Sequence, residues 1–236
     1  MSATLAPARD ASVAEKAPVK VAASATAAAP PPPAAAAAGP AAADPPSQHP
    51  AIASVLYTAE QLAARVEEMA AQCALDYADK RPVLLTILKG GFIFAADFAR
   101  LLRPWPAGTT LAFCRARSYG ARTETSGEVL VEGPDGDEVR GRHVLLLDDL
   151  SDSGLTLATV RARCLAAGAL SVKAAVALDK AARRLPQCPA PEYVGFGIPN
   201  VWVSGLGMDT NELYRGLGGG SVVVLSKAAQ AEALGR

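Results

Sequence analysis

The chain lacks any bias toward one sign of charge. Its 236 residues contain 23 lysines and arginines against 23 aspartates and glutamates, with only 2 histidines. Proteins that bind nucleic acid or membrane surfaces through charge usually carry an excess of basic side chains. The balance argues against nonspecific binding to either, so we expect no nucleic acid and no membrane among the partners.

Cysteine is sparse and shows none of the spacings of a disulfide or metal framework. The four cysteines, at positions 73, 114, 164 and 188, include no C-x-x-C pair and have no histidine nearby. Isolated cysteines of this kind suit reduced thiols in the cytosol. The chain also has no apolar run approaching the roughly 18 residues that span a bilayer. We therefore expect a soluble, cytoplasmic protein.

The first fifty residues lack the apolar periodicity of a folded domain. Alanine accounts for 20 of them and proline for 10. Such a segment buries too little surface to offset its conformational entropy, so residues 1–50 are predicted to form a disordered tail. It has no apolar stretch typical of a secretory signal, but its few acidic residues leave an organellar transit peptide as an alternative. Residues 51–236 are enough for one domain with a substantial core.

Strand-like and helix-like segments alternate in the rest of the chain. Thr58 and Gln61 have the spacing of a capping box, and the following apolar residues share one helical face to about residue 76. Further helices are expected at 92–102 and 155–167. Apolar runs predict strands at 82–88, 109–119, on both sides of a turn within 127–147, and at 172–180, 193–198, 202–208 and 222–225. This alternation implies an α/β domain with a mostly parallel, twisted sheet between helices.

The stretch HVLLLDDLSDSGLTL (143–157) combines a buried strand with several carboxylates. Isolated charge is costly to bury, so Asp148 and Asp149 are expected at the carboxyl end of the strand, facing a ligand or a metal. Ligands of open α/β sheets bind at this end. The small residues that follow lead into a helix N-terminus, whose free N–H groups favour an anion. Carboxylates beside a phosphate cradle fit a ligand with sugar hydroxyls, or a Mg²⁺ ion.

Other interpretations of this stretch remain open at this point. An acidic pair after a buried strand also occurs in receiver-like domains, which hold Mg²⁺ for phosphoryl transfer. Asp152 would also suit a helix N-cap. The dinucleotide and P-loop alternatives are excluded by spacing, since neither G-x-G-x-x-G nor G-x-x-x-x-G-K-[ST] occurs in the chain.

Five segments resemble, in the same order, the hypoxanthine-guanine branch of the type I phosphoribosyltransferases. VLLLDDLSDSGLTL (144–157) is similar to the phosphoribosyl-diphosphate motif of the superfamily. The others are LTILKGGFIFAADF (85–98), RSYG (117–120), VALDK (176–180) and YVGFGIPNVWVSGLGMDTNELYRGL (193–217), of which the last is the most particular to 6-oxopurine enzymes. The resemblance covers about residues 52–225. It implies the type I fold, with a small hood formed by terminal segments.

The resemblance implies a site for phosphoribosyl diphosphate. Asp148 and Asp149 would accept the ribose 2′- and 3′-hydroxyls, directly or through Mg²⁺. The backbone and hydroxyl groups of the next loop would hold the 5′-phosphate, at Ser153, Gly154, Leu155 and Thr156.

The same resemblance implies a diphosphate subsite. Lys89 and Gly90 match a loop in which the Lys–Gly peptide is typically cis. Ser118 and Tyr119 match a mobile loop that closes over the reaction. Arg215 would contact the leaving diphosphate, to which a guanidinium fork is suited.

The purine site is implied by a further set of residues. Asp152 would act as general base near N7, and Lys180 would donate a hydrogen bond to O6. Trp202 would stack on the base. The backbone carbonyls of Val203 and Asp209 would accept from the amino group of guanine, and the Asp209 carboxylate would hold a second Mg²⁺.

These implications define an expected function. The chain would use Mg²⁺ to transfer the 5-phosphoribosyl group from phosphoribosyl diphosphate to hypoxanthine or guanine in purine salvage. A homodimer or homotetramer is implied. Two alternatives stay open: a sister transferase that prefers xanthine or another base, and a nucleotide-sensing regulator on the same fold. The neutral net charge counts against a regulator that binds RNA.

Overall fold

The computed structural model describes residues 49–119 and 128–235. The predicted disordered tail, residues 1–50, lies outside the described residues except for its last two. None of the helices in the described ranges is both long enough and apolar enough to cross a membrane.

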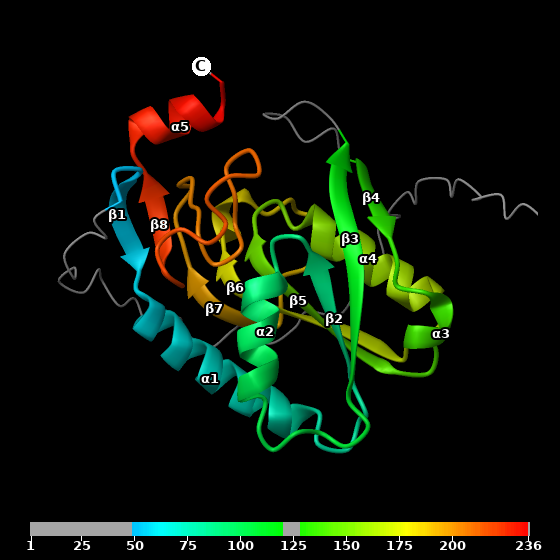
Figure 1. Ribbon diagram of the computed structural model, residues 1–236. Coiled ribbons are helices and arrows are strands. Elements are labelled where there is room, and N and C mark those ends of the chain that lie inside the picture. The colour runs from blue at the N-terminus through cyan, green and yellow to red at the C-terminus, as the bar shows by residue number, and fades with distance from the viewer. Residues whose placement is uncertain (1–48, 120–127, 236) are drawn as a thin grey trace, which may run out of the picture.

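A six-stranded sheet forms the centre of the domain (Figure 1). Its order is β4-β3-β2-β5-β6-β7, and every neighbouring pair is parallel except β3 and β4. The strands are β2 (Val83–Leu88), β3 (Thr110–Tyr119), β4 (Glu128–Glu132), β5 (His143–Ser151), β6 (Ser171–Asp179) and β7 (Tyr193–Gly197). The predicted mostly parallel α/β sheet is confirmed.

Helices cover both faces of this sheet (Figure 1). One apolar cluster joins α1 (Ala59–Asp76) and α2 (Phe92–Leu101) to alternate residues of the central strands. A second cluster packs α4 (Leu155–Ala166) on the opposite face. Because β2 and the first half of β5 are covered on both sides, their sequences are almost continuously apolar, VLLTIL in β2 and VLLL at 144–147 in β5.

The start of α1 follows from its sequence. The Thr58 hydroxyl accepts from the Gln61 backbone N–H at 3.3 Å, and the Gln61 side chain accepts from the Thr58 N–H at 2.9 Å. These reciprocal bonds satisfy two donors that a helix N-terminus otherwise leaves free. The predicted capping box is confirmed.

A small hood lies to one side of the sheet. It contains β1 (Ile52–Tyr57) paired antiparallel with β8 (Val222–Leu225), followed by α5 (Lys227–Ala233). The segment 198–221 connects β7 to this hood and passes over the carboxyl ends of the parallel strands (Figure 1). The terminal segments therefore form the hood that the sequence predicted.

One local prediction was wrong. Residues 202–208 form isolated bridges instead of a strand, because Gly205, Leu206 and Gly207 all have positive φ and break the extended backbone. The two strands predicted on both sides of a turn within 127–147 are present as β4 and β5. Between them, Asp135 caps the one-turn helix α3 (Gly136–Val139), and β4 pairs with β3, not with β5.

Candidate active site

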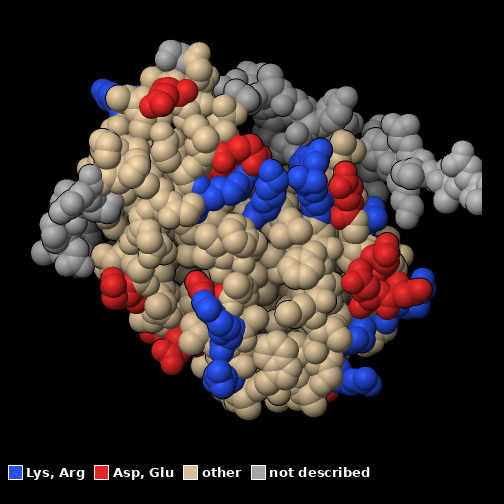
Figure 2. All heavy atoms as spheres, viewed as in Figure 1, with Lys and Arg blue, Asp and Glu red and all other residues tan. Residues whose placement is uncertain are grey.

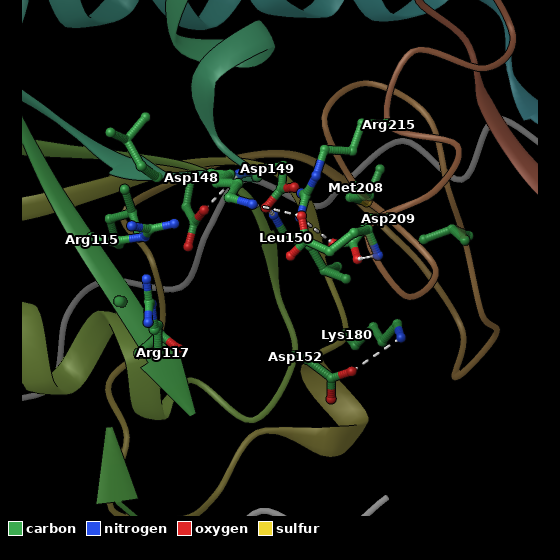
Figure 3. A pocket seen from close by; sticks show the side chains of 18 of the residues that line it. Arg115, Arg117, Asp148, Asp149, Leu150, Asp152, Lys180, Met208, Asp209 and Arg215 are labelled. Atoms are coloured by element: carbon green, nitrogen blue, oxygen red, sulfur yellow. Dashed lines mark hydrogen bonds and ion pairs between the residues drawn. The ribbon is translucent and has the colours of Figure 1, made fainter. Parts of the chain in front are cut away.

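A polar pocket of about 800 Å³ opens at the carboxyl ends of β2, β3, β5 and β6. The segment 198–221 supplies the opposite wall. Figure 2 shows basic and acidic side chains gathered side by side near this edge, while the centre of the same face is largely uncharged. In Figure 3, Asp148, Asp149, Asp209 and Arg215 meet at one end of the pocket, and Asp152 and Lys180 lie at the other. The pocket therefore has two chemically distinct ends.

Asp148 and Asp149 are buried carboxylates on the pocket wall. Their exposed fractions are 7% and 8%. Burial raises the pKa of Asp149 to about 6, and burial together with the neighbouring Asp149 charge raises the pKa of Asp148 well above its ordinary value. Gly90 lies so close to Asp149 that a Cβ there would be 2.3 Å from Asp149 Oδ2. Position 90 therefore has no room for a side chain unless the Asp149 carboxylate moves.

This pair provides donors suited to Mg²⁺. Within the described residues, neither carboxylate forms an ion pair with lysine or arginine, and no cluster of three or more protein ligands surrounds them. Mg²⁺ is usually held by one or two carboxylates together with water and ligand phosphates. Two buried acidic side chains that open into a pocket fit this pattern.

The loop after β5 forms a close turn before α4. Gly154 precedes the helix with φ +78°, and a Cβ there would lie 2.9 Å from Cys188 Cβ. The Leu155 side chain packs in an apolar cluster with Val129 and Cys188, so only its backbone N–H is available at the helix N-terminus. Thr156 lines the pocket. Ser153 lies beside it in the turn, where its hydroxyl accepts from the Leu155 N–H at 3.4 Å.

Asp152 lies in the pocket between two cations. Lys180 Nζ donates to Asp152 Oδ2 at 3.1 Å, and Arg183 Nε donates to the other carboxylate oxygen. Lys180 has an exposed fraction of only 5% and its backbone N–H donates to the Ser151 carbonyl at 2.8 Å. The N-cap interpretation of Asp152 is wrong, because Gly154 occupies the N-cap position.

Trp202 forms part of the pocket wall. Its side chain is half exposed, at 51%, and its Nε1 donates to the Thr210 hydroxyl at 2.6 Å. The Thr210 hydroxyl is in turn 2.9 Å from the Ser204 hydroxyl. One edge of the indole is therefore anchored, while the side chain borders the pocket. Val203 follows it on the wall.

A network of ion pairs closes the other end of the pocket. Arg215 Nη2 lies 2.9 Å from Asp209 Oδ1 and 3.2 Å from Glu212 Oε2. Lys89 Nζ donates to the same Glu212 oxygen at 2.7 Å. Asp209 Oδ2 accepts from the Glu212 backbone N–H at 2.7 Å. The Asp209 carboxylate is thus engaged on both oxygens.

Comparison with known families identifies this arrangement. The family model described as the phosphoribosyl transferase domain matches residues 53–211. The chain belongs to the phosphoribosyl transferase domain family. Family membership decides against the receiver-like interpretation of the aspartate pair.

Similar members of the phosphoribosyl transferase family come from several organisms. A hypoxanthine-guanine phosphoribosyltransferase from Leishmania donovani is 38% identical over 72% of this chain and 82% of that protein. One from Streptococcus pneumoniae strain R6 is 35% identical over 70% of this chain and 90% of that protein. Among solved structures, a Trypanosoma cruzi hypoxanthine phosphoribosyl transferase has a TM-score of 0.71 at 32% identity, covering 81% of this chain and 100% of that one.

The cis peptide that the phosphoribosyl transferase resemblance implied lies one residue earlier in the chain than expected. The cis peptide joins Leu88 to Lys89, where β2 passes into the loop, and not Lys89 to Gly90. Ser118 and Tyr119 are the last two residues of β3, and their side chains lie outside what the structure describes. Their roles stay predictions.

Several pocket residues of this phosphoribosyl transferase were missed from the sequence. Arg115 and Arg117 project from β3 into the pocket (Figure 3). Their two-residue spacing at the end of a parallel strand was a usable signal, since alternate residues share one face. Glu212 and the Arg183 contact with Asp152 gave no such signal, because both depend on how distant loops meet.

Proposed function

We propose that this chain transfers the 5-phosphoribosyl group from phosphoribosyl diphosphate to N9 of hypoxanthine or guanine in purine salvage. The products are the nucleoside monophosphate and diphosphate. The observation that carries this proposal is the pocket itself, which joins a buried carboxylate pair, a helix N-terminus and a buried lysine. The similar hypoxanthine-guanine phosphoribosyltransferases support the same reaction.

Phosphoribosyl diphosphate binds across the carboxylate end of the pocket. Asp148 and Asp149 accept the ribose hydroxyls or hold Mg²⁺. The 5′-phosphate binds at the start of α4, where backbone N–H groups and hydroxyls converge, from Ser153, Gly154, Leu155 and Thr156. The diphosphate binds near Lys89, Gly90 and Arg215, and Ser118 and Tyr119 cover it.

The purine binds at the other end. Lys180 donates to O6, and a 6-amino group would bring donor against donor, so adenine is disfavoured. Trp202 stacks on the base. The carbonyls of Val203 and Asp209 accept from the 2-amino group of guanine. The burial of Lys180 and the half-exposed Trp202 side chain support these assignments.

Asp152 acts at the reacting bond. Its carboxylate accepts the purine proton at N7 as the bond from N9 to the ribose forms, and stabilises positive charge on the ribosyl ring. Mg²⁺, when bound, neutralises the diphosphate and helps it to leave. Asp148 and Asp149 fit one ion. The Asp209 carboxylate would hold a second after its contact with Arg215 rearranges.

We further propose that the protein acts in the cytoplasm as a homodimer or homotetramer. The four buried, unpaired cysteines suit a reducing compartment. Leu111 and Phe113 lie on the α2 side of β3 with exposed fractions above one half, an apolar surface suited to a second copy.

The test is diphosphate release by the full chain with Mg²⁺, phosphoribosyl diphosphate and one base at a time. We expect release with hypoxanthine and guanine but not with adenine or uracil. Release with xanthine alone would support the sister transferase instead. If no base gives diphosphate release while nucleotide binding is intact, the chain would be a nucleotide sensor on this fold.

A further inference from the structure

Two cations assigned to the diphosphate share one carboxylate oxygen. Lys89 Nζ lies 2.7 Å from Glu212 Oε2, and Arg215 Nη2 lies 3.2 Å from the same atom. Lys89 and Glu212 are 123 positions apart in the sequence, so this contact joins the two walls of the pocket. Glu212 also lines the pocket, and the proposed reaction gives it no role.

The backbone of the segment 209–213 holds Glu212 in this position. Thr210 and Leu213 exchange backbone hydrogen bonds of 3.0 and 3.1 Å across a tight turn. Asn211 Nδ2 donates to the Ala233 carbonyl at 2.7 Å, which ties the turn to α5. Glu212 itself has φ +68°, and its N–H donates to Asp209 Oδ2 at 2.7 Å. These hydrogen bonds therefore fix the turn from which the Glu212 carboxylate extends.

A diphosphate at this end needs the donors that Glu212 occupies. Its oxygens carry the same sign of charge as the Glu212 carboxylate, so the two anions repel each other when both are close to Lys89 and Arg215. The carboxylate thus competes with the ligand for both cations.

We propose that Glu212 is an internal counter-ion of the diphosphate subsite that weakens diphosphate binding and speeds diphosphate release. This inference rests on the proposed function, which assigns diphosphate to Lys89 and Arg215. Glu212 is 63% exposed at its side chain, so water screens its contacts and the effect is moderate. Removing its charge should tighten diphosphate binding by about 3- to 10-fold.

The experiment is calorimetric titration of the full chain with diphosphate in excess Mg²⁺. Glu212→Gln keeps the size of the side chain and removes its charge. The matched control is Glu68→Gln on α1, because Glu68 is 66% exposed and pairs with Arg65 at 2.6 Å, outside the pocket. Thermal unfolding of each variant confirms that it is folded.

The inference predicts that Glu212→Gln lowers the Kd for diphosphate by about 3- to 10-fold, while Glu68→Gln leaves it unchanged. Equal or weaker binding by Glu212→Gln, with normal binding by the wild type, would overturn this inference alone. A wild-type chain that binds no diphosphate would overturn the proposed function and this inference together.

Discussion

The carboxylates of Asp148 and Asp149 lie side by side at the end of a buried strand, where desolvation opposes their ionisation. Burial raises the pKa of both groups. The free protein is therefore less stable at a pH where both carboxylates are charged. The charged form is the one that is proposed to bind a cation or ribose hydroxyls. Asp148 and Asp149 therefore lower the stability of the free protein while providing the carboxylates for ligand binding.

Replacement of Asp149 with asparagine tests this effect on stability. The folded-state pKa of about 6 lies above the ordinary value of 3.8, so the wild type loses stability as the pH rises from about 4 through about 6. Asparagine does not ionise, and its oxygen can still accept from the Leu150 N–H. In metal-free buffer we expect Asp149→Asn to be more stable than wild type by about 1–3 kcal/mol at pH 7.5, with little gain at pH 4.5.

Urea denaturation at the two pH values measures this difference. The exposed Asp79→Asn serves as the control, and we expect it to change the free energy of unfolding by about 0.5 kcal/mol or less. A destabilised Asp149→Asn at pH 7.5 would contradict the prediction.

Gly90 provides a second test at a single position. A Cβ there would lie 2.3 Å from Asp149 Oδ2, so Gly90→Ala must displace either the carboxylate or the loop that contains Gly90. We expect kcat/KM for phosphoribosyl diphosphate to fall by about 10- to 100-fold, the consequence of a strongly overpacked contact. Gly197→Ala is the matched control, because a Cβ there meets nothing within 4 Å. Equal kinetics for the two variants would show that the loop adjusts freely.

At this same scale, the sequence predicted residues whose chemistry is local. Asp148 and Asp149 lie in the second half of β5, Asp152 follows β5 and Lys180 follows β6. The structure brings all four to one pocket. Glu212 could not be predicted, because its contact with Lys89 joins positions 123 residues apart through an irregular turn. No periodic pattern in the sequence predicts such a contact.

Among the elements, α4 directly follows the turn that is proposed to bind the 5′-phosphate. Its N-terminus follows Gly154, and its buried face packs on the sheet through Leu157, Val160 and Cys164. If this face is weakened, the helix and the loop before it lose their support.

Two leucines of α4 separate packing from surface effects. Leu157 is 3% exposed and Leu165 is 48% exposed. We expect Leu157→Ala to lower the free energy of unfolding by about 2–5 kcal/mol, because a buried cavity forms. Leu165→Ala should change it by about 0.5 kcal/mol or less. Chemical denaturation measures both, and similar losses would contradict the assigned packing.

Elements with regular periodicity were predictable, and those set by unusual backbone angles were not. The run 202–208 has an apolar composition suited to a strand, yet Leu206 has φ +49° between two glycines of positive φ. These angles arise from close backbone contacts: a Cβ on Gly207 would lie 2.0 Å from the Gly90 carbonyl oxygen. Composition does not report contacts with a distant loop.

For the whole molecule, the described residues that line the pocket all lie between positions 87 and 215. The hood begins at β1, where the Ile52 N–H donates to the His49 carbonyl at 3.0 Å. Deletion of residues 1–48 keeps this contact and every described residue that lines the pocket. We therefore expect kcat/KM to be unchanged in the truncated chain. A large loss of kcat/KM would show that the tail contributes to catalysis.

We propose that phosphoribosyl transfer in this pocket depends on its carboxylates. The most direct measurement is the rate of diphosphate release from phosphoribosyl diphosphate with hypoxanthine and Mg²⁺, compared for wild type, Asp152→Asn and Asp97→Asn. Asp97 is a surface carboxylate on α2 that pairs with Arg100 outside the pocket. We expect Asp97→Asn to match the wild type and Asp152→Asn to be slower by about 10²- to 10⁴-fold while still binding phosphoribosyl diphosphate. No release by the wild type, or equal rates for wild type and Asp152→Asn, would contradict the account.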